Sequence, residues 1–191
     1  MVRAYHLILT CYGFWLPNDP RGSYSSQVWS NAIREFGEAT KVNTHLSVAH
    51  RPHDHNARRA AKQALLRPPV HFTGKQALIV AEGIGEIAKR NNLIIYACAV
   101  MPDHVHLVVD RHATIDAEGM VHRIKAKATQ RLNAADLGFG GTPWCKGRWV
   151  VYLNSHEDVD RATRYVEQNL IKAGLRPQRW PFVQPSRDRD G

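Results

Sequence analysis

The segment from Leu93 to Asp110 carries the strongest β signal in the chain and most constrains its fold. Leu93–Met101 is an apolar run, Pro102-Asp103 has the residues of a tight turn, and His104–Asp110 is a second apolar run. Two such runs separated by two turn residues predict a β-hairpin. A hairpin pairs its strands antiparallel, so the pattern disfavours an all-parallel sheet.

Helical patterns flank the hairpin on both sides. Thr73 and Gln76 form a capping box ahead of an apolar stripe that ends near Asn92. Thr114 is expected to cap a helix that runs to about Ala135. The other expected elements are a strand at Ala4–Tyr12, a helix at Ala57–Leu66, a strand at Arg148–Leu153, and a last helix opened by Ser155 and Asp158 and ended by Gly174. Strands interleaved with helices around a hairpin predict an α+β sandwich.

The length of 191 residues suits one domain, which we expect to span residues 1–175. Within it, residues 13–70 are rich in Gly, Pro, Asn, Ser and His and predict an irregular excursion. Residues 176–191 are rich in Pro and Arg and predict a basic, flexible tail. The three cysteines are far apart and lack metal-site spacing, which is typical of a protein in a reducing cytoplasm.

The charge of the chain points to a polyanionic partner. Lys and Arg number 26 against 17 Asp and Glu, which gives a net charge of +9. Such an excess indicates nucleic acid or an anionic membrane surface. No apolar run reaches the roughly 18–20 residues of a spanning helix, so nucleic acid is the preferred reading.

His104 and His106 lie on the second strand of the predicted hairpin, on either side of Val105. Strand alternation places the two imidazoles on one face, about 6–7 Å apart. Two neutral imidazoles at this spacing can share a divalent cation. The alternative is a pair of histidines on a solvated edge, but the flanking residues are strongly apolar and buried polar rings are costly without partners.

Tyr165 and Asn169 lie four residues apart on the last predicted helix, next to its apolar stripe. They therefore share one helix face, with their Cβ atoms about 5–6 Å apart. By itself this pair is equally typical of a tyrosine at the edge of a core that bonds an amide. Its significance depends on the histidine pair.

Together, these segments resemble the single-tyrosine HUH transposases, which include the transposases of small insertion sequences and the REP-associated tyrosine transposases. The resemblance covers most of the chain. It is carried by the segments Tyr5–Thr10, Phe14–Gly22, Ala99–His106, Trp144–Trp149 and Arg164–Gly174. One departure is Leu170, which follows Asn169 where the family usually has proline. The last helix should therefore be straighter at this point.

The resemblance implies a fold, a chemistry and a site. The fold would be a ferredoxin-like or RRM-like sandwich, an antiparallel sheet with helices packed on one face. His104, His106 and Asn169 would bind Mg²⁺ or Mn²⁺, and Tyr165 would be the nucleophile that cleaves DNA and forms a 5′-phosphotyrosine. The substrate would be single-stranded DNA that is folded into a hairpin near the cleavage point, and the active form would be a homodimer.

The helix expected at 114–135 has basic residues opposite its apolar stripe and no acidic residue after Gly119. A one-signed face of this length is typical of phosphate binding, although it is also compatible with a solvated face. Trp144 and Trp149 flank Cys-Lys-Gly-Arg, and could stack bases or simply belong to the core. The residues expected to bind DNA are Arg123, Lys125, Lys127, Arg131, Lys146 and Arg148.

Several minor readings stay open. His122, Lys125 and Lys127 are candidates, by location, for activating Tyr165, whose phenol needs a nearby base or cation. Asp103 is either a turn residue or a partner of a metal-binding imidazole. The second His-x-His, at 53–55, is read as a loop. The rival functions are a non-catalytic DNA hairpin-binding protein or repressor, a replication or relaxase-type nuclease, and a metal-dependent hydrolase.

Overall fold

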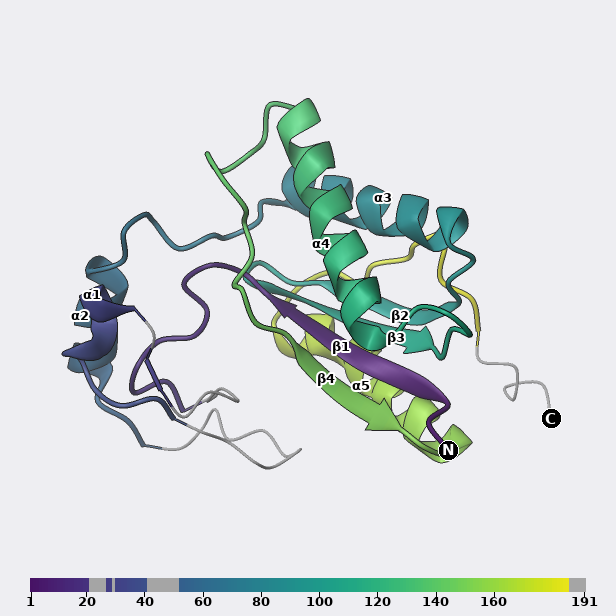
Figure 1. Ribbon diagram of the computed structural model, residues 1–191, viewed down its shortest axis with the longest axis horizontal. Helices are drawn as coiled ribbons and strands as arrows, with labels where there is room; N and C mark the ends of the chain where they lie inside the picture. Colours follow the sequence, from purple (N-terminus) through teal and green to yellow (C-terminus); the bar gives the residue numbers. More distant parts are fainter. Residues whose placement is uncertain (21–26, 29, 41–51, 186–191) are drawn as a thin grey trace. The chain divides into compact units, whose positions relative to one another are not determined.

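A computed structural model describes residues 1–20, 27–28, 30–40 and 52–185. The chain forms two compact units, Met1–Thr10 with His71–Gly191, and Cys11–Val70. The first unit contains a four-stranded antiparallel sheet in the order β2-β3-β1-β4 (Figure 1). Its strands are β1 (Ala4–Thr10), β2 (Ile95–Val100), β3 (His104–Asp110) and β4 (Trp149–Leu153). The predicted hairpin is confirmed as β2 and β3.

The connections of this unit follow the ferredoxin-like path. Helix α3 (Gly74–Arg90) leads into the β2-β3 hairpin, and α4 (Ala117–Ala134) joins β3 to β4. Helix α5 (His156–Lys172) is an addition after β4. Strand β1 pairs antiparallel with both β3 and β4, as this path requires. The α+β class expected from the sequence is confirmed.

Helices cover both faces of the sheet. Ala4 and Val108 share a buried cluster with Val166 of α5. Because side chains alternate along a strand, the fully buried Leu7 and Leu107 lie on the opposite face, toward α3 and α4. Figure 1 shows α4 in front of the sheet and α5 behind it. The expectation that all helices pack on one face is therefore wrong for α5, since both faces of β1 and β3 are apolar and both need cover.

Local capping signals set most helix ends. The capping boxes at Thr73 of α3 and Ser155 of α5 are both present, and Gly174 adopts φ +69° just beyond α5. Thr114 does not cap α4, because the Asp116 side chain accepts from Gly119 N and begins the helix two residues later. Helix α5 continues through Leu170 without a break, as expected. Among the described helices, none is both long and apolar enough to cross a membrane.

The segment after α5 lies along the outer edge of β2. The Gln178 side chain donates to Val100 O and accepts from Val100 N, both at 2.9 Å. Farther on, Gln184 N donates to Ile95 O at 2.9 Å, and Val183 forms a parallel bridge with Ile95. The expected loose order from residue 176 is thus wrong over 178–184, because these residues satisfy backbone groups of an edge strand. Residues 186–191 lie outside the described part.

The described part of the second unit contains two short helices, α1 (Asn31–Arg34) and α2 (His55–Gln63). The Asp54 carboxylate accepts from the backbone N–H groups of Asn56 and Ala57, so α2 begins two residues before the predicted start. This contact explains the aspartate of the second His-x-His as a helix cap. The parts of the predicted excursion at 21–26, 29 and 41–51 lie outside the described residues.

Candidate metal and nucleophile site

Three histidines lie on the face of the sheet that α5 covers. His104 and His106 alternate with Val105 on β3, and they share their face with Val108, which packs against α5. On the neighbouring strand β1, His6 shares its face with Ala4 of the same cluster. The register pairs His6 with Val108 and Ile8 with His106. The predicted same-face placement of His104 and His106 is confirmed, and β1 adds His6 beside them.

The imidazoles form a continuous chain of polar contacts. The Asp103 carboxylate lies 2.6 Å from His104 Nδ1, and His104 Nε2 lies 3.0 Å from His106 Nε2. The other ring nitrogen of His106, Nδ1, lies 2.9 Å from His6 Nε2. The Asp103 carboxylate thus contacts the ring nitrogen of His104 that does not face His106. This contact favours the interpretation of Asp103 as a partner of a metal-binding imidazole over that of a turn residue alone.

The donor set fits a divalent cation. Two nitrogen ligands at right angles on an ion, each about 2.1 Å away, lie about 3.0 Å apart. The His104 and His106 Nε2 atoms have this 3.0 Å separation. Among the described residues, no three His, Cys, Asp or Glu side chains have a metal-holding arrangement. An amide oxygen is a further type of side-chain ligand that divalent cations accept.

Helix α5 supplies Tyr165 and Asn169. The apolar side of the helix, which includes Val159 and Val166, packs against the sheet and places Tyr165 beside the histidines. The Tyr165 ring centroid lies 5.8 Å from those of both His6 and His106, and the residue is 42% exposed. One turn on, the Asn169 amide nitrogen is buried without a hydrogen-bond partner. A buried amide without a partner, one helical turn from Tyr165, fits the role of a ligand, since the two ends of an amide are exchangeable by rotation.

Burial keeps two of the imidazoles neutral. Desolvation, followed by the charge of His104, lowers the pKa of His6 from 6.5 to about 4. The same causes, with a further contribution from His6, lower the pKa of His106 well below its usual value. At neutral pH both rings therefore have an unprotonated nitrogen, which is the form that binds metals.

These pKa values predict that the metal-free protein loses stability in mild acid. The unfolded chain takes up protons on His6 below pH 6.5, whereas the folded chain resists them down to about pH 4. Stability must therefore fall as the pH falls through this window, by about 3 kcal/mol for His6 at pH 4. Urea unfolding in EDTA between pH 7 and 4 measures the loss. His6→Gln should flatten the profile, and equal slopes for both proteins would contradict the assignment.

The family model described as "Transposase IS200 like" matches residues 67–169, which is more than half of the chain and includes both histidines of β3, Tyr165 and Asn169. The chain belongs to the IS200-like transposase family. The comparison with curated proteins found no match.

Two solved structures are similar to this family member. One is a REP-associated tyrosine transposase bound to a REP hairpin, with 21% identity over 57% of this chain and 64% of that one, and a TM-score of 0.45. The other is a proposed transposase from Deinococcus radiodurans, with 18% identity over 92% of this chain and 93% of that one, and a TM-score of 0.41. The chain thus spans somewhat less than two thirds of the first.

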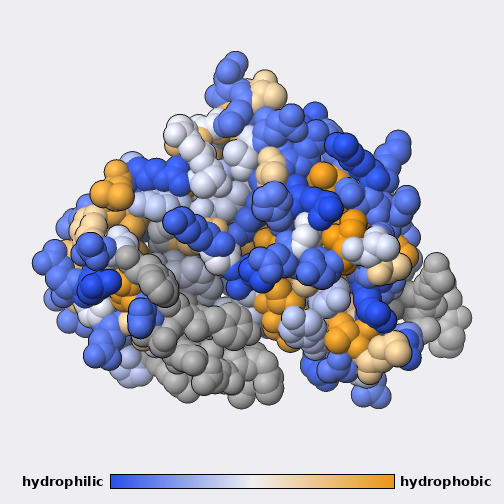
Figure 2. Space-filling view, viewed as in Figure 1, coloured by the Kyte–Doolittle hydropathy of each residue, from blue (hydrophilic) through white to orange (hydrophobic). Residues whose placement is uncertain are grey.

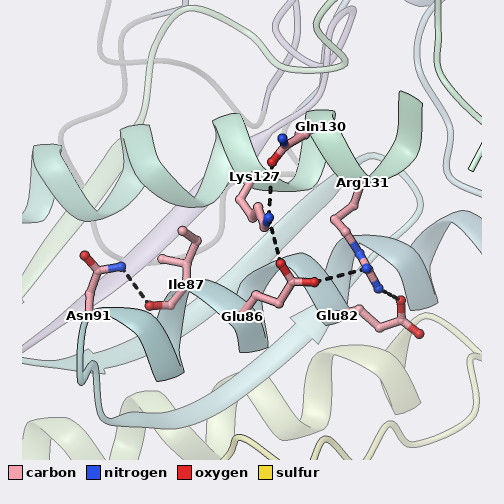
Figure 3. Close-up of polar contacts among 7 residues, drawn as sticks. All are labelled: Glu82, Glu86, Ile87, Asn91, Lys127, Gln130 and Arg131. Atoms are coloured by element: carbon pink, nitrogen blue, oxygen red, sulfur yellow. Dashed lines mark hydrogen bonds and ion pairs between the residues drawn. The ribbon is translucent and has the colours of Figure 1, made fainter. Parts of the chain in front are cut away.

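Part of the basic face predicted on α4 is directed at α3. Lys127 Nζ lies 2.7 Å from the Glu86 carboxylate, and Arg131 pairs with both Glu82 and Glu86 (Figure 3). The hydrogen bond from Lys127, which outweighs the opposing effect of desolvation, keeps the pKa of Glu86 below its usual value. Lys127 and Arg131 therefore already neutralise carboxylates of the same chain. Their DNA contact stays a prediction that this geometry does not favour.

The other predicted DNA-binding residues are held differently. Lys125 Nζ donates to the carbonyl oxygens of Cys145 and Gly147, at 2.9 and 2.7 Å, and so anchors the loop before β4. Arg123, Lys146 and Arg148 are exposed, and Arg148 pairs with Glu118 at 2.6 Å. Figure 2 shows a largely hydrophilic surface on the α4 side of the first unit. Arg123 and Lys146 are thus the best placed of the six for phosphate.

The structure decides two sequence-based interpretations of smaller features and adds one residue that the sequence analysis did not name. Trp144 is buried, its ring contacts Phe72, and its indole N–H donates to Lys125 O, so it is a core residue. The activation candidates on α4 lie across the sheet from Tyr165. Lys172, which the sequence did not single out, has its Nζ 6.0 Å from the Tyr165 ring centroid.

Proposed function

We propose that this chain is a single-stranded DNA transposase that cleaves and rejoins one strand through a 5′-phosphotyrosine on Tyr165. In this proposal His104, His106 and Asn169 hold Mg²⁺ or Mn²⁺. The observation that carries it is the placement of the Tyr165 ring 5.8 Å from that of His106, whose Nε2 meets that of His104 at 3.0 Å. Membership of the IS200-like transposase family supports DNA strand transfer as the reaction class.

The chemistry follows from these positions. A divalent cation, when bound, would polarise a non-bridging oxygen of the scissile phosphate and offset its charge. The Tyr165 oxygen attacks phosphorus, the bond to the 3′ oxygen breaks, and the 5′ phosphate stays on tyrosine. A 3′ hydroxyl can later attack the phosphotyrosine, so rejoining needs no external energy source.

The remaining parts of the proposal concern the partners. The catalytic domain would comprise residues 1–175, the substrate would contain a DNA hairpin, the active form would be a homodimer, and the protein would act in the cytoplasm. The hairpin and the dimer follow from the family resemblance. The net charge of +9 supports a polyanionic partner.

Strand polarity tests the reaction directly. The protein is incubated with Mn²⁺ and single-stranded DNA from its own genomic flanks, labelled at either end. A 5′-phosphotyrosine predicts that the 3′ label moves with the protein on a denaturing gel, while the 5′ label is released with an extendable 3′ hydroxyl. A free 5′ phosphate without an adduct would indicate a hydrolase. Binding without cleavage under Mg²⁺ or Mn²⁺ would indicate a DNA-binding protein.

DNA affinity should depend on Lys146 and little on Lys127. Lys146→Ala removes an exposed charge and is expected to weaken binding several-fold and lower the salt slope by about 0.7. Lys127→Ala removes a charge that is already paired with Glu86 and should change affinity less than about twofold. Fluorescence anisotropy at several salt concentrations measures both. An equal loss in the two variants would mean that the α4 face opens to bind phosphate.

A further inference from the structure

His6 contacts both parts of the candidate site, although the proposed chemistry gives it no role. Its Nε2 lies 2.9 Å from His106 Nδ1, on the side of the ring away from His104. Its ring meets the Tyr165 ring edge-on, with centroids 5.8 Å apart. The residue is 7% exposed and lies on the central strand β1, so its position is fixed by the sheet.

We propose that His6 is a positioning residue that accepts a hydrogen bond from His106 Nδ1 and so fixes the His106 tautomer whose Nε2 binds the cation. The inference rests on the proposed metal site. A neutral imidazole carries one N–H, so a His106 that binds through Nε2 must carry its hydrogen on Nδ1. That hydrogen points at His6 Nε2, which accepts it if His6 carries its own hydrogen on Nδ1.

Without the cation, the same contacts specify a different tautomer for His106 and for His6. The Asp103 carboxylate accepts from His104 Nδ1, which leaves Nε2 of a neutral His104 without hydrogen. The 3.0 Å contact between the two Nε2 atoms then needs the hydrogen on His106 Nε2. His106 Nδ1 becomes the acceptor, and His6 must donate from Nε2.

Cation binding therefore reverses the direction of the hydrogen bond between His6 Nε2 and His106 Nδ1. The hydrogen of His106 moves from Nε2 to Nδ1, and that of His6 also moves from Nε2 to Nδ1. Each ring keeps one hydrogen, so the pair neither gains nor loses a proton. His6 makes this exchange possible because an imidazole can change the same ring nitrogen from a donor into an acceptor by changing its tautomer.

Nitrogen-15 NMR of the imidazole side chains tests the exchange. Spectra of the whole protein are compared at pH 8, first metal-free and then saturated with diamagnetic Mg²⁺. The expected result is that His6 and His106 are both Nε2–H tautomers without Mg²⁺ and both Nδ1–H tautomers with it. A His6 tautomer that stays the same when Mg²⁺ binds would overturn the proposal. This measurement uses the wild-type chain and does not depend on any variant folding.

Mn²⁺ affinity tests the positioning role independently of catalysis. Electron paramagnetic resonance counts free Mn²⁺ in titrations without DNA. His6→Phe keeps a ring of similar size but has no acceptor, and should weaken Mn²⁺ binding by about 10- to 100-fold. His6→Gln offers an acceptor oxygen near the position of Nε2 and should restore most of the affinity. His122→Phe, an exposed histidine on α4, is the matched control and should bind as wild type.

The outcomes separate this inference from the proposed function. Wild-type Mn²⁺ affinity in His6→Phe, or an equal loss in His6→Phe and His6→Gln with matching thermal stability, would overturn the role of His6 as an acceptor. A His6-dependent Mn²⁺ site in a protein that forms no DNA adduct would leave the inference standing and reject the proposed strand transfer.

Discussion

Replacing Tyr165 with Phe is expected to abolish the covalent protein–DNA adduct and to reduce strand cleavage by more than about a thousandfold. The substitution removes the oxygen that attacks phosphorus and leaves the ring beside His6 and His106. Because the residue is 42% exposed, the free energy of unfolding should change by less than about 0.5 kcal/mol. Denaturing gels with labelled single-stranded DNA and Mn²⁺ measure the adduct, and thermal unfolding checks the fold.

A second tyrosine provides the control. Tyr152 is 59% exposed on β4, and Tyr152→Phe removes an equivalent phenol away from the histidines. This variant should form the adduct at the wild-type rate. An adduct that persists in Tyr165→Phe, or that disappears in Tyr152→Phe, would show that the nucleophile has been assigned to the wrong residue.

The second large effect is expected from His104→Ala. This change removes one of the two Nε2 atoms that meet at 3.0 Å and leaves Asp103 without its imidazole partner. Mn²⁺ affinity should fall at least about a hundredfold, since the loss of a ligand exceeds that of an outer partner. Mn²⁺-dependent cleavage should be lost, while DNA binding should remain. Metal titration, cleavage and anisotropy on the same preparation separate these effects.

His104 suits this test better than His106. Its side chain is 18% exposed, whereas His106 is almost fully buried between two other imidazoles, so removing His106 would also leave buried polar groups unpaired. His122→Ala, on the exposed side of α4, controls for unspecific metal binding. Cleavage by His104→Ala at the wild-type rate, with the same metal requirement, would place the metal elsewhere.

The features that the sequence predicted correctly are local ones. The hairpin at Leu93–Asp110 and the capping boxes at Thr73 and Ser155 depend on residues a few positions apart, and the structure contains all of them. Thr114 failed as a cap because Asp116, two residues on, is a stronger competitor for the same role. The spacing of His104 and His106 predicted a shared face for the same local reason, strand alternation.

The features that the sequence missed depend on pairing between distant segments. His6 lies 100 residues from His106, and only the β1-β3 register brings them together. Likewise, the partners of Lys127 and Arg131 are glutamates of α3, so a basic face read from α4 alone overstated the charge available to DNA. An apolar residue before and after His6 gave a hint of its burial, because a histidine inside such a strand needs a polar partner.

The contacts made by Gln178 and Gln184 limit where a further strand can add to this sheet. They occupy backbone groups at both ends of β2, so a foreign strand would find its hydrogen-bonding positions there already taken. Of the described strands, β4 is then the one whose outer edge can accept such an addition. A chain that ends before Gln178 would leave the backbone groups at the outer edge of β2 unpaired as well. We therefore expect the shortened protein to self-associate.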